Sequence, residues 1–405
     1  MMKRTIPNII KNGLCLGCGL CEAIHKPECT MRINSRGFYV PTFKSDTVYE
    51  QDRIIPRICP GVNIISDTSK NHTSIWGNVE MVSNAWAADD VIRQKSSSGG
   101  ITSALAIYLL ESKQVDAILH VGVKEDDYLH NRLFVSKTKE EVLRNNSSRY
   151  APAAVFNGIK DILDDAPETT YAFVGKPCDI AGIQNFLRAF PQYTGRIRYF
   201  LSIFCAGMPS YNATERALAT FKKHEKPISL RYRGDGWPGY FTAMYRNGTS
   251  CRMTYNDSWG KILGRDLGFR CKICPDGIGL LADISSGDSW NTKDGYPDFT
   301  EAKGKNFCFI RTKSGVELFE SARRYGYIVT EQLDVNTVKD MQRYQYNRRH
   351  LVGWRVAAVQ LMTGGILHFK GLGYYKTALH SDFAKGAKDA VGTAKRLLKA
   401  RRNGQ

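Results

Sequence analysis

Eight of the eleven cysteines in this 405-residue chain stand in spacings that suit metal or cluster ligation. Cys15, Cys18 and Cys21 are separated by two residues each, the spacing of a loop that wraps one side of a cubane iron–sulfur cluster. In C-x2-C-x2-C-x3-C-P runs a fourth cysteine follows and ligates a second cluster. Here that position is His25, so the fourth thiolate of the first site must come from a more distant residue.

Two residues compete for that fourth position. Cys59 is followed by Pro60 and Gly61, and a Cys-Pro pair is the ending that such cluster motifs use. Cys29 lies closer to the triplet but has no such context. We favour Cys59 and interpret residues 14–61 as a ferredoxin-like unit that keeps one cluster. A zinc knuckle or a set of inert buried thiols is the alternative for the triplet.

A second set of cysteines lies further along the chain. Cys178 and Cys205 each follow a predicted strand, and residues just past neighbouring parallel strands meet at one edge of a sheet. Cys271 and Cys274 form a C-x2-C pair that can complete a four-thiolate site. By spacing alone, zinc and a 4Fe–4S cluster suit this set equally well.

A run of small polar residues precedes the first predicted amphipathic helix. Ser97, Ser98, Gly99 and Gly100 would bring hydroxyls, backbone N–H groups and a helix N-terminus together, which is an anion site. The chain contains no Walker loop, and its one G-x-G-x-x-G match, at residues 234–239, neither follows a long strand nor opens a helix, so it is neither a P-loop enzyme nor a standard dinucleotide-binding one. Helix capping without a ligand is the alternative.

The elements that position these residues alternate in type. From Val79 to about residue 225 strands and helices alternate, which predicts an α/β domain with a largely parallel sheet. After Pro227 the pattern favours antiparallel strands, with Asn247-Gly248 as a hairpin turn, so the whole is a mixed-sheet α/β protein, α+β overall. We predict a cluster domain at 1–75, an α/β domain at 76–225, a second cluster and substrate region at 226–334 and a basic helical tail at 335–405.

The charge is unevenly distributed. The net charge is +18, and residues 335–405 carry fourteen Lys and Arg against three acids. This favours an acidic partner, a phosphorylated ligand or an anionic membrane surface. We expect no specific nucleic acid, because RNA-recognition motifs are missing. The first nineteen residues contain no apolar signal run, and cysteine usage suits a reducing compartment, so a cytoplasmic protein, peripherally attached to a membrane, is the expectation.

Several segments resemble one known family. "SSSGGITSALAIYLLES", "SSRYAPA", "VGKPCDIAGIQ", "YRGDGWPG" and "CKICPDGIGLLADISSGDSW" are similar to the coenzyme F-420 hydrogenase/dehydrogenase beta-subunit family. The resemblance implies FAD and one or two 4Fe–4S clusters. It implies that residues 76–225 form a flavin-binding domain, with residues 97–100 as the loop that holds the flavin phosphates and Ser148 and Tyr150 as further flavin contacts. It also implies that the second cysteine set holds a 4Fe–4S cluster. His25 and the tail depart from the family pattern; the tail resembles extensions of bacterial members associated with surface-glycan synthesis.

Further residues are candidates for the reaction itself. Arg231 and Arg233 suit an anionic substrate and Trp237 suits stacking on a ring, although the same stretch also reads as a surface strand ending in a turn. Asp288 is a candidate proton donor, with a turn-forming aspartate as the alternative. Lys176 is a candidate for stabilising reduced flavin or cluster charge, with an ordinary exposed lysine as the alternative.

The expected function is a redox converter. Electrons would move between a one-electron donor of the ferredoxin type and a two-electron hydride acceptor, either coenzyme F-420 or a glycan-pathway substrate. One alternative is an electron-relay subunit that passes charge to a partner redox subunit and has no substrate of its own. A zinc-stabilised basic binding scaffold is the other.

Overall fold

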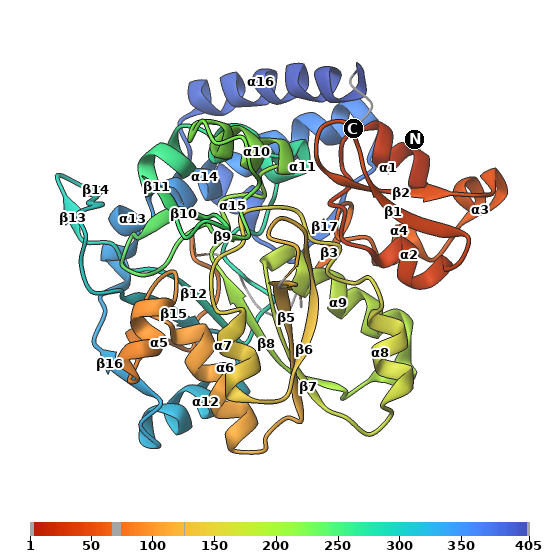
Figure 1. Cartoon of the computed structure of the whole chain (residues 1–405). Helices are drawn as coiled ribbons and strands as arrows, with labels where there is room; N and C mark the ends of the chain where they lie inside the picture. The colour runs from red at the N-terminus through yellow and green to blue at the C-terminus, as the bar shows by residue number, and fades with distance from the viewer. Residues whose placement is uncertain (1–3, 67–73, 125, 403–405) are drawn as a thin grey trace.

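A mixed eight-stranded sheet organises the chain, and the computed structural model describes residues 4–66, 74–124 and 126–402 (Figure 1). The strand order is β16-β4-β15-β12-β8-β7-β5-β6. Strands β5, β7, β8 and β12 run parallel, and the remaining pairings are antiparallel, which confirms the expected α/β class. In that order the strands are Ile328–Glu331, Met81–Ala87, Asn306–Ile310, Ile284–Asp288, Ile197–Ile203, Tyr171–Gly175, Ala117–Val123 and Asn131–Ser136.

Apolar helices cover both faces of this sheet, as parallel strands require. On one face α6 (Ile101–Glu111) and α12 (Lys313–Arg324) pack against strand residues such as Ile118. On the other face α9 (Pro177–Ala189) packs against strand residues such as Leu119. Ile118 and Leu119 are adjacent in β5 and belong to different clusters because side chains alternate along a strand.

Helix starts match the sequence signals. Gly100 precedes α6 with φ of +76°, a conformation that glycine adopts without strain. Thr138 accepts a hydrogen bond from the backbone N–H of Glu141 and caps α7 (Lys139–Arg144). The remaining α-helices between residues 90 and 272 are α5 (Asp90–Lys95), α8 (Ile159–Asp165), α10 (Tyr211–Ala219) and α11 (Phe269–Lys272).

Smaller sheets flank the main one. Strands β9 (Ser229–Arg231), β10 (Tyr240–Met244) and β11 (Ser250–Thr254) form an antiparallel sheet, and the predicted Asn247-Gly248 turn joins the last two. Strands β12, β15 and β16 come from the region after residue 226, yet they pair within the main sheet. The main sheet therefore draws strands from both sides of the boundary expected at 225.

The N-terminal region carries the first cysteines on short elements. These are α1 (Ile6–Lys11), α2 (Leu20–His25), β1 (Cys29–Ile33), β2 (Tyr39–Phe43), α3 (Asp46–Gln51), α4 (Ile55–Ile58) and β3 (Asn63–Ile65). Strand β3 pairs in parallel with β17 (His368–Lys370) from the far end of the chain. In Figure 1 the two termini accordingly lie close together.

The C-terminal segment is helical and is built into the protein. It contains α13 (Val338–Met341), α14 (Arg343–Thr363), α15 (Tyr374–Ala378) and α16 (Phe383–Arg402). Val352, Val356 and Val359 of α14 are fully buried in the same apolar cluster as α9. Only α16 lies on the outside of the molecule along its length (Figure 1). None of the helices in the described ranges is long and apolar enough to cross a membrane.

Candidate functional site

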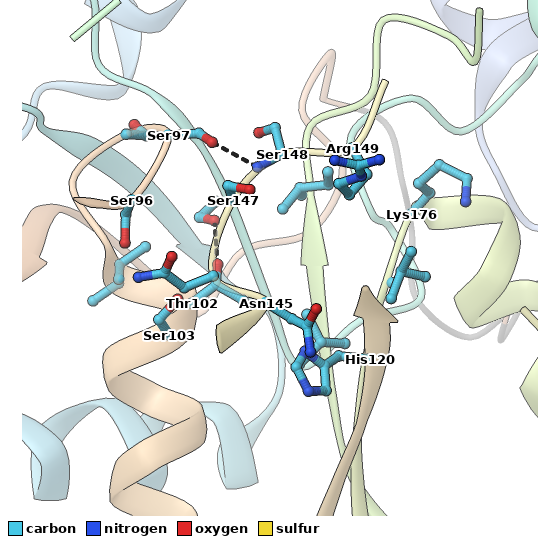
Figure 2. A pocket seen from close by; sticks show the side chains of 18 of the residues that line it. Ser96, Ser97, Thr102, Ser103, His120, Asn145, Ser147, Ser148, Arg149 and Lys176 are labelled. Atoms are coloured by element: carbon cyan, nitrogen blue, oxygen red, sulfur yellow. Dashed lines mark hydrogen bonds between the residues drawn. The ribbon is translucent and has the colours of Figure 1, made fainter. Parts of the chain in front are cut away.

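A cavity of about 280 Å³ lies beside the carboxyl ends of the parallel strands (Figure 2). Its walls include Gly175 at the end of β7, Phe204 just past β8 and Asp288 at the end of β12, together with the N-terminus of α6. Open α/β sheets bind ligands at this edge because the loops that follow the strands diverge there.

The serine loop borders the cavity. Ser97, Ser98, Gly100, Ser148 and Tyr150 all line it. The Oγ of Ser97 accepts a hydrogen bond from the backbone N–H of Ser148 at 2.6 Å, which joins the two segments (Figure 2). The Oγ of Ser98 accepts one from the Nδ2 of Asn306 at 3.0 Å.

Gly99 does not line the cavity but allows the loop to pass close to β15. A Cβ atom placed on Gly99 would lie 2.7 Å from the Oδ1 of Asn306 and 2.9 Å from its backbone N. A side chain at this position would therefore push the loop away from the strand.

Two buried polar atoms of the cavity have no partner among the described residues. They are the Oγ of Ser96 and the Nδ2 of Asn146. Buried polar groups in folded proteins are almost always hydrogen-bonded, so an unpaired hydroxyl and amide facing one cavity suit a polar ligand with acceptor oxygens. The donor set fits the phosphates of a flavin dinucleotide.

His120 also lines the cavity, and the sequence analysis did not select it. Its Nε2 lies 2.7 Å from the Oγ of Ser136, and burial lowers the pKa of the imidazole to about 4. The ring is therefore neutral near pH 7. The available signal was a single polar residue within the apolar strand "AILHVGV". Asn146 gave no comparable signal, because it lies in a loop that folding alone brings to the cavity.

Lys176 lies between this cavity and the second cysteine set. Its Nζ pairs with the Oδ2 of Asp179 at 2.6 Å. Burial alone would lower the pKa of Lys176, but the charges of Asp179, Cys178 and Cys205 outweigh it and the pKa is raised. Lys176 is thus a protonated lysine held by Asp179 and not the ordinary exposed lysine considered as the alternative.

Asp288 and Arg233 form a bidentate ion pair in the cavity wall. Both guanidinium Nη atoms donate to the carboxylate, at 2.9 and 3.0 Å, and the indole Nε1 of Trp237 donates to it at 2.8 Å. Three hydrogen bonds engage the Asp288 carboxylate with its neighbours in the wall, so this placement favours a positioning role for Asp288 over proton donation. Arg233 is also engaged within the wall, because both its Nη atoms donate to Asp288 and only 2% of its surface is exposed.

Arg231 and Trp237 do not line the cavity. The indole of Trp237 stacks on Trp290 with ring centroids 4.5 Å apart and an interplanar angle of 7°. Arg231 donates to the backbone carbonyl of Lys95 at 2.6 Å and pairs with Asp235. Their placement favours holding the turn between β9 and β10 over binding a substrate.

The first four cysteines gather in the N-terminal region. Burial raises the pKa of Cys21 well above its usual value, and the charges of Cys15, Cys59 and Cys18 raise it further. Cys59 also raises the pKa of both Cys15 and Cys18, after burial. Cys29 is coupled in this way to Cys21 and Cys15, whereas Cys59 is coupled to all three cysteines of the triplet, which favours Cys59 as the fourth ligand.

The second four cysteines also come together. Burial and then the charge of Cys271 raise the pKa of Cys205 to about 12, with Cys274 contributing as well. A cavity of about 20 Å³ lies among Cys178, Cys205 and Cys271. Leu16 from the first cysteine loop lines the same small cavity, so the two cysteine sites are neighbours.

Zinc sites and cubane clusters require different spacings between their thiols. No three His, Cys, Asp or Glu side chains within the described ranges lie close enough to hold one metal ion. A tetrahedral zinc site with Zn–S of about 2.3 Å needs sulfurs roughly 3.8 Å apart. A cubane cluster binds each thiolate at a different iron atom, so its ligands stand further from one another.

Comparisons with known proteins agree with this architecture. Residues 82–160 match the family described as coenzyme F420 hydrogenase/dehydrogenase, beta subunit N-term, and residues 168–336 match the family described for the C terminus of the same beta subunit. The chain belongs to this family. Residues 337–402, with α14 to α16, lie beyond the matched region.

Its relatives are oxidoreductases or subunits of them. The chain is 26% identical over 265 residues to the coenzyme F420 hydrogenase subunit beta of Methanococcus voltae, covering 64% of this chain and 86% of that protein. It is 26% identical over 247 residues to the F420-dependent formate dehydrogenase 1 subunit beta of Methanococcus maripaludis, covering 60% of each. It is 24% identical over 336 residues to the coenzyme F420-dependent sulfite reductase of Methanocaldococcus jannaschii, covering 78% of this chain and 47% of the reductase.

A solved structure shares the fold. A chain of the F420-reducing [NiFe] hydrogenase complex from Methanosarcina barkeri superposes with a TM-score of 0.54 at 19% identity. The match covers 76% of this chain and 99% of that one. At this level of identity the likeness concerns the fold alone.

Proposed function

We propose that this chain is an iron–sulfur flavoprotein oxidoreductase with FAD in the 280 Å³ cavity and two 4Fe–4S clusters. Cys15, Cys18, Cys21 and Cys59 would hold the first cluster. Cys178, Cys205, Cys271 and Cys274 would hold the second. When bound, a flavin supplies the ability to take up electrons singly or in pairs, which links one-electron donors to hydride acceptors.

One observation supports the proposal most strongly. The 280 Å³ cavity and the small cavity among the second cysteines share Ala153, Lys176 and Asp179 as walls. A flavin and a cluster bound in these two places would be separated by a single layer of side chains. Leu16, from the first cysteine loop, also lines the small cavity, so the first cluster would lie next to the second.

Different residues of this chain would bind the phosphates, balance charge and hold the cavity wall. Ser97, Ser98 and the glycines before α6 would hold phosphate oxygens at the helix N-terminus. Lys176 would balance the negative charge that electrons bring to either neighbouring site. The ion pair between Arg233 and Asp288 would keep the cavity wall rigid beside the reacting ring.

Coenzyme F420 is the first candidate for the hydride partner, because the names of three relatives include it. A ferredoxin or a partner redox subunit is the candidate for the one-electron side, and the shared fold with a chain of a hydrogenase complex supports a partner subunit. A substrate from a glycan pathway is the second candidate acceptor, based on the resemblance of the tail.

Reduced coenzyme F420, added anaerobically to the chain carrying both clusters and FAD, tests this proposal. We expect bleaching of the flavin absorbance together with reduction of the clusters, detected by electron paramagnetic resonance. A Cys178→Ala variant should still show flavin bleaching but slower cluster reduction. A flavin that dithionite bleaches and reduced coenzyme F420 does not would exclude this coenzyme as the partner.

A membrane surface is the proposed contact of α16. Its exposed side presents Val391 and Leu398 beside exposed lysines and arginines, and its acid Asp389 is paired with Arg355 and Arg396. An apolar and basic face of this kind suits anionic lipid headgroups. Sedimentation with vesicles containing 30% phosphatidylserine should retain the chain, and Lys388→Glu with Lys395→Glu should release it. Equal retention by neutral vesicles would contradict the contact.

A further inference from the structure

Helix α14 is fastened to the second cysteine site by two buried side chains. Arg348 donates from Nη1 to the backbone carbonyl of Cys205 at 3.0 Å and from Nη2 to that of Cys271 at 2.6 Å. Gln345, one turn earlier, donates from Nε2 to the same Cys205 carbonyl at 2.9 Å. One guanidinium thus joins two cysteine segments that are 66 residues apart in the sequence.

Arg348 carries a buried charge without a carboxylate partner. Only 3% of its surface is exposed, and no Asp or Glu pairs with it among the described residues. Its Nε, like the Oε1 of Gln345, is buried and has no hydrogen-bond partner there. A buried cation needs a compensating negative charge. The groups near it that can carry one are Cys274, Tyr344, Cys205 and Cys271, and the three cysteines carry it as thiolates when they ligate a cluster.

Arg348 and Gln345 lie outside the part of the chain that matches the family, which ends at residue 336, whereas Cys205 and Cys271 lie within it. We propose that Arg348 is a positioning residue of the second cluster, which links the Cys205 and Cys271 segments and raises the reduction potential of that cluster. The inference rests on the proposed function, because it requires a cluster at this site.

The physical reason is electrostatic. A cluster that takes up one electron from the proposed ferredoxin-type donor becomes more negative by one unit, while the guanidinium keeps its proton and no bond forms or breaks. A fixed positive charge in a poorly polarisable interior stabilises the reduced state more than the oxidised one.

A redox titration of the full chain, followed by electron paramagnetic resonance, tests this inference with Arg348→Gln and Arg348→Lys. Iron and sulfide are first measured in each protein. We expect Arg348→Gln to make the equilibrium constant for reduction of one cluster at least tenfold smaller, a shift of about 59 mV to lower potential for a one-electron couple. Arg348→Lys keeps the positive charge, so its equilibrium constant for reduction of the cluster should stay within threefold of the wild-type value.

Arg311 provides a matched control. It is also 3% exposed, and its guanidinium donates to the backbone carbonyls of Trp76, Asn78 and Ile278 and to Ser285, with no cysteine among its partners. Arg311→Gln should change thermal stability and leave both potentials in place.

The outcomes separate the inference from the function on which it rests. Wild-type protein with fewer than two clusters would overturn the proposed function and the inference together. Two clusters with unchanged potentials in Arg348→Gln, or equal shifts of both, would overturn the inference alone. If the Arg348→Gln protein loses its iron, the Arg348→Lys protein provides the test. A change of more than tenfold in its equilibrium constant for cluster reduction, despite the retained charge, would overturn the electrostatic role.

Discussion

Gly99→Ala tests whether the serine loop holds a ligand. The new Cβ would lie 2.7 Å from the Oδ1 of Asn306 and 2.9 Å from its backbone N, closer than real Cβ contacts allow. Overpacking of this kind costs about 1–3 kcal/mol. A shift of the loop away from β15 toward the cavity would relieve the contact, and the cost would then fall on binding of the proposed FAD.

The expected size of the effect follows from that cost. With 1.4 kcal/mol for each tenfold change, 1–3 kcal/mol weakens FAD binding by roughly 5- to 150-fold. Equilibrium dialysis of the apoprotein with FAD measures the dissociation constant directly. The free energy of unfolding, measured by urea denaturation of the apoprotein, shows how much of the cost is carried by the fold.

A second glycine provides the control. A Cβ on Gly315, near the start of α12, would lie 2.6 Å from the carbonyl oxygen of Asp283, and Gly315 does not line the cavity. Gly315→Ala should destabilise the protein by a similar amount and leave FAD affinity unchanged. Unchanged FAD affinity in Gly99→Ala, or an equal loss in both variants, would refute the assignment of this loop.

Three further predictions concern other parts of the account. Cys59→Ser should lower the iron content from about eight to about four per chain, and Cys29→Ser should keep it at about eight; the reverse result would make Cys29 the ligand. Because burial lowers the pKa of His120 to about 4 from 6.5, the unfolded state binds more protons between these values, and the free energy of unfolding should fall by about 3 kcal/mol from pH 7 to pH 4. His120→Asn should remove that part of the pH dependence in chemical denaturation, and an unaltered pH profile would contradict it. Asp288→Asn leaves the buried Arg233 without its countercharge and should destabilise the protein by about 3–5 kcal/mol in urea unfolding, whereas a loss below 1 kcal/mol would show that the pair is dispensable.

Local patterns predicted most of the sheet and its helices. The alternation around Val82, the apolar run of β5 and the Asn247-Gly248 turn each depend on neighbours in the sequence, so propensity and periodicity suffice. The serine loop was predictable for the same reason, because Ser97 and Gly100 are adjacent to the helix that they begin.

Long-range contacts were not predictable in this way. Trp237 stacks on Trp290 and Asp288 binds Arg233, pairs separated by more than fifty residues, so a single sequence suggested separate substrate and proton-donor roles. The C-terminal segment read as a basic tail because its charge is visible in the sequence. That Arg348 is buried against cysteine carbonyls depends on where α14 packs, which the periodicity of α14 does not reveal.

The most direct test of the central claim is the cofactor content of anaerobically purified protein. Iron, acid-labile sulfide, zinc and flavin would be measured on one sample, with visible spectra before and after dithionite. The account predicts about eight iron, about eight sulfide and one FAD per chain, with absorbance that bleaches on reduction. Zinc without iron or flavin, and a spectrum that dithionite leaves unchanged, would contradict it.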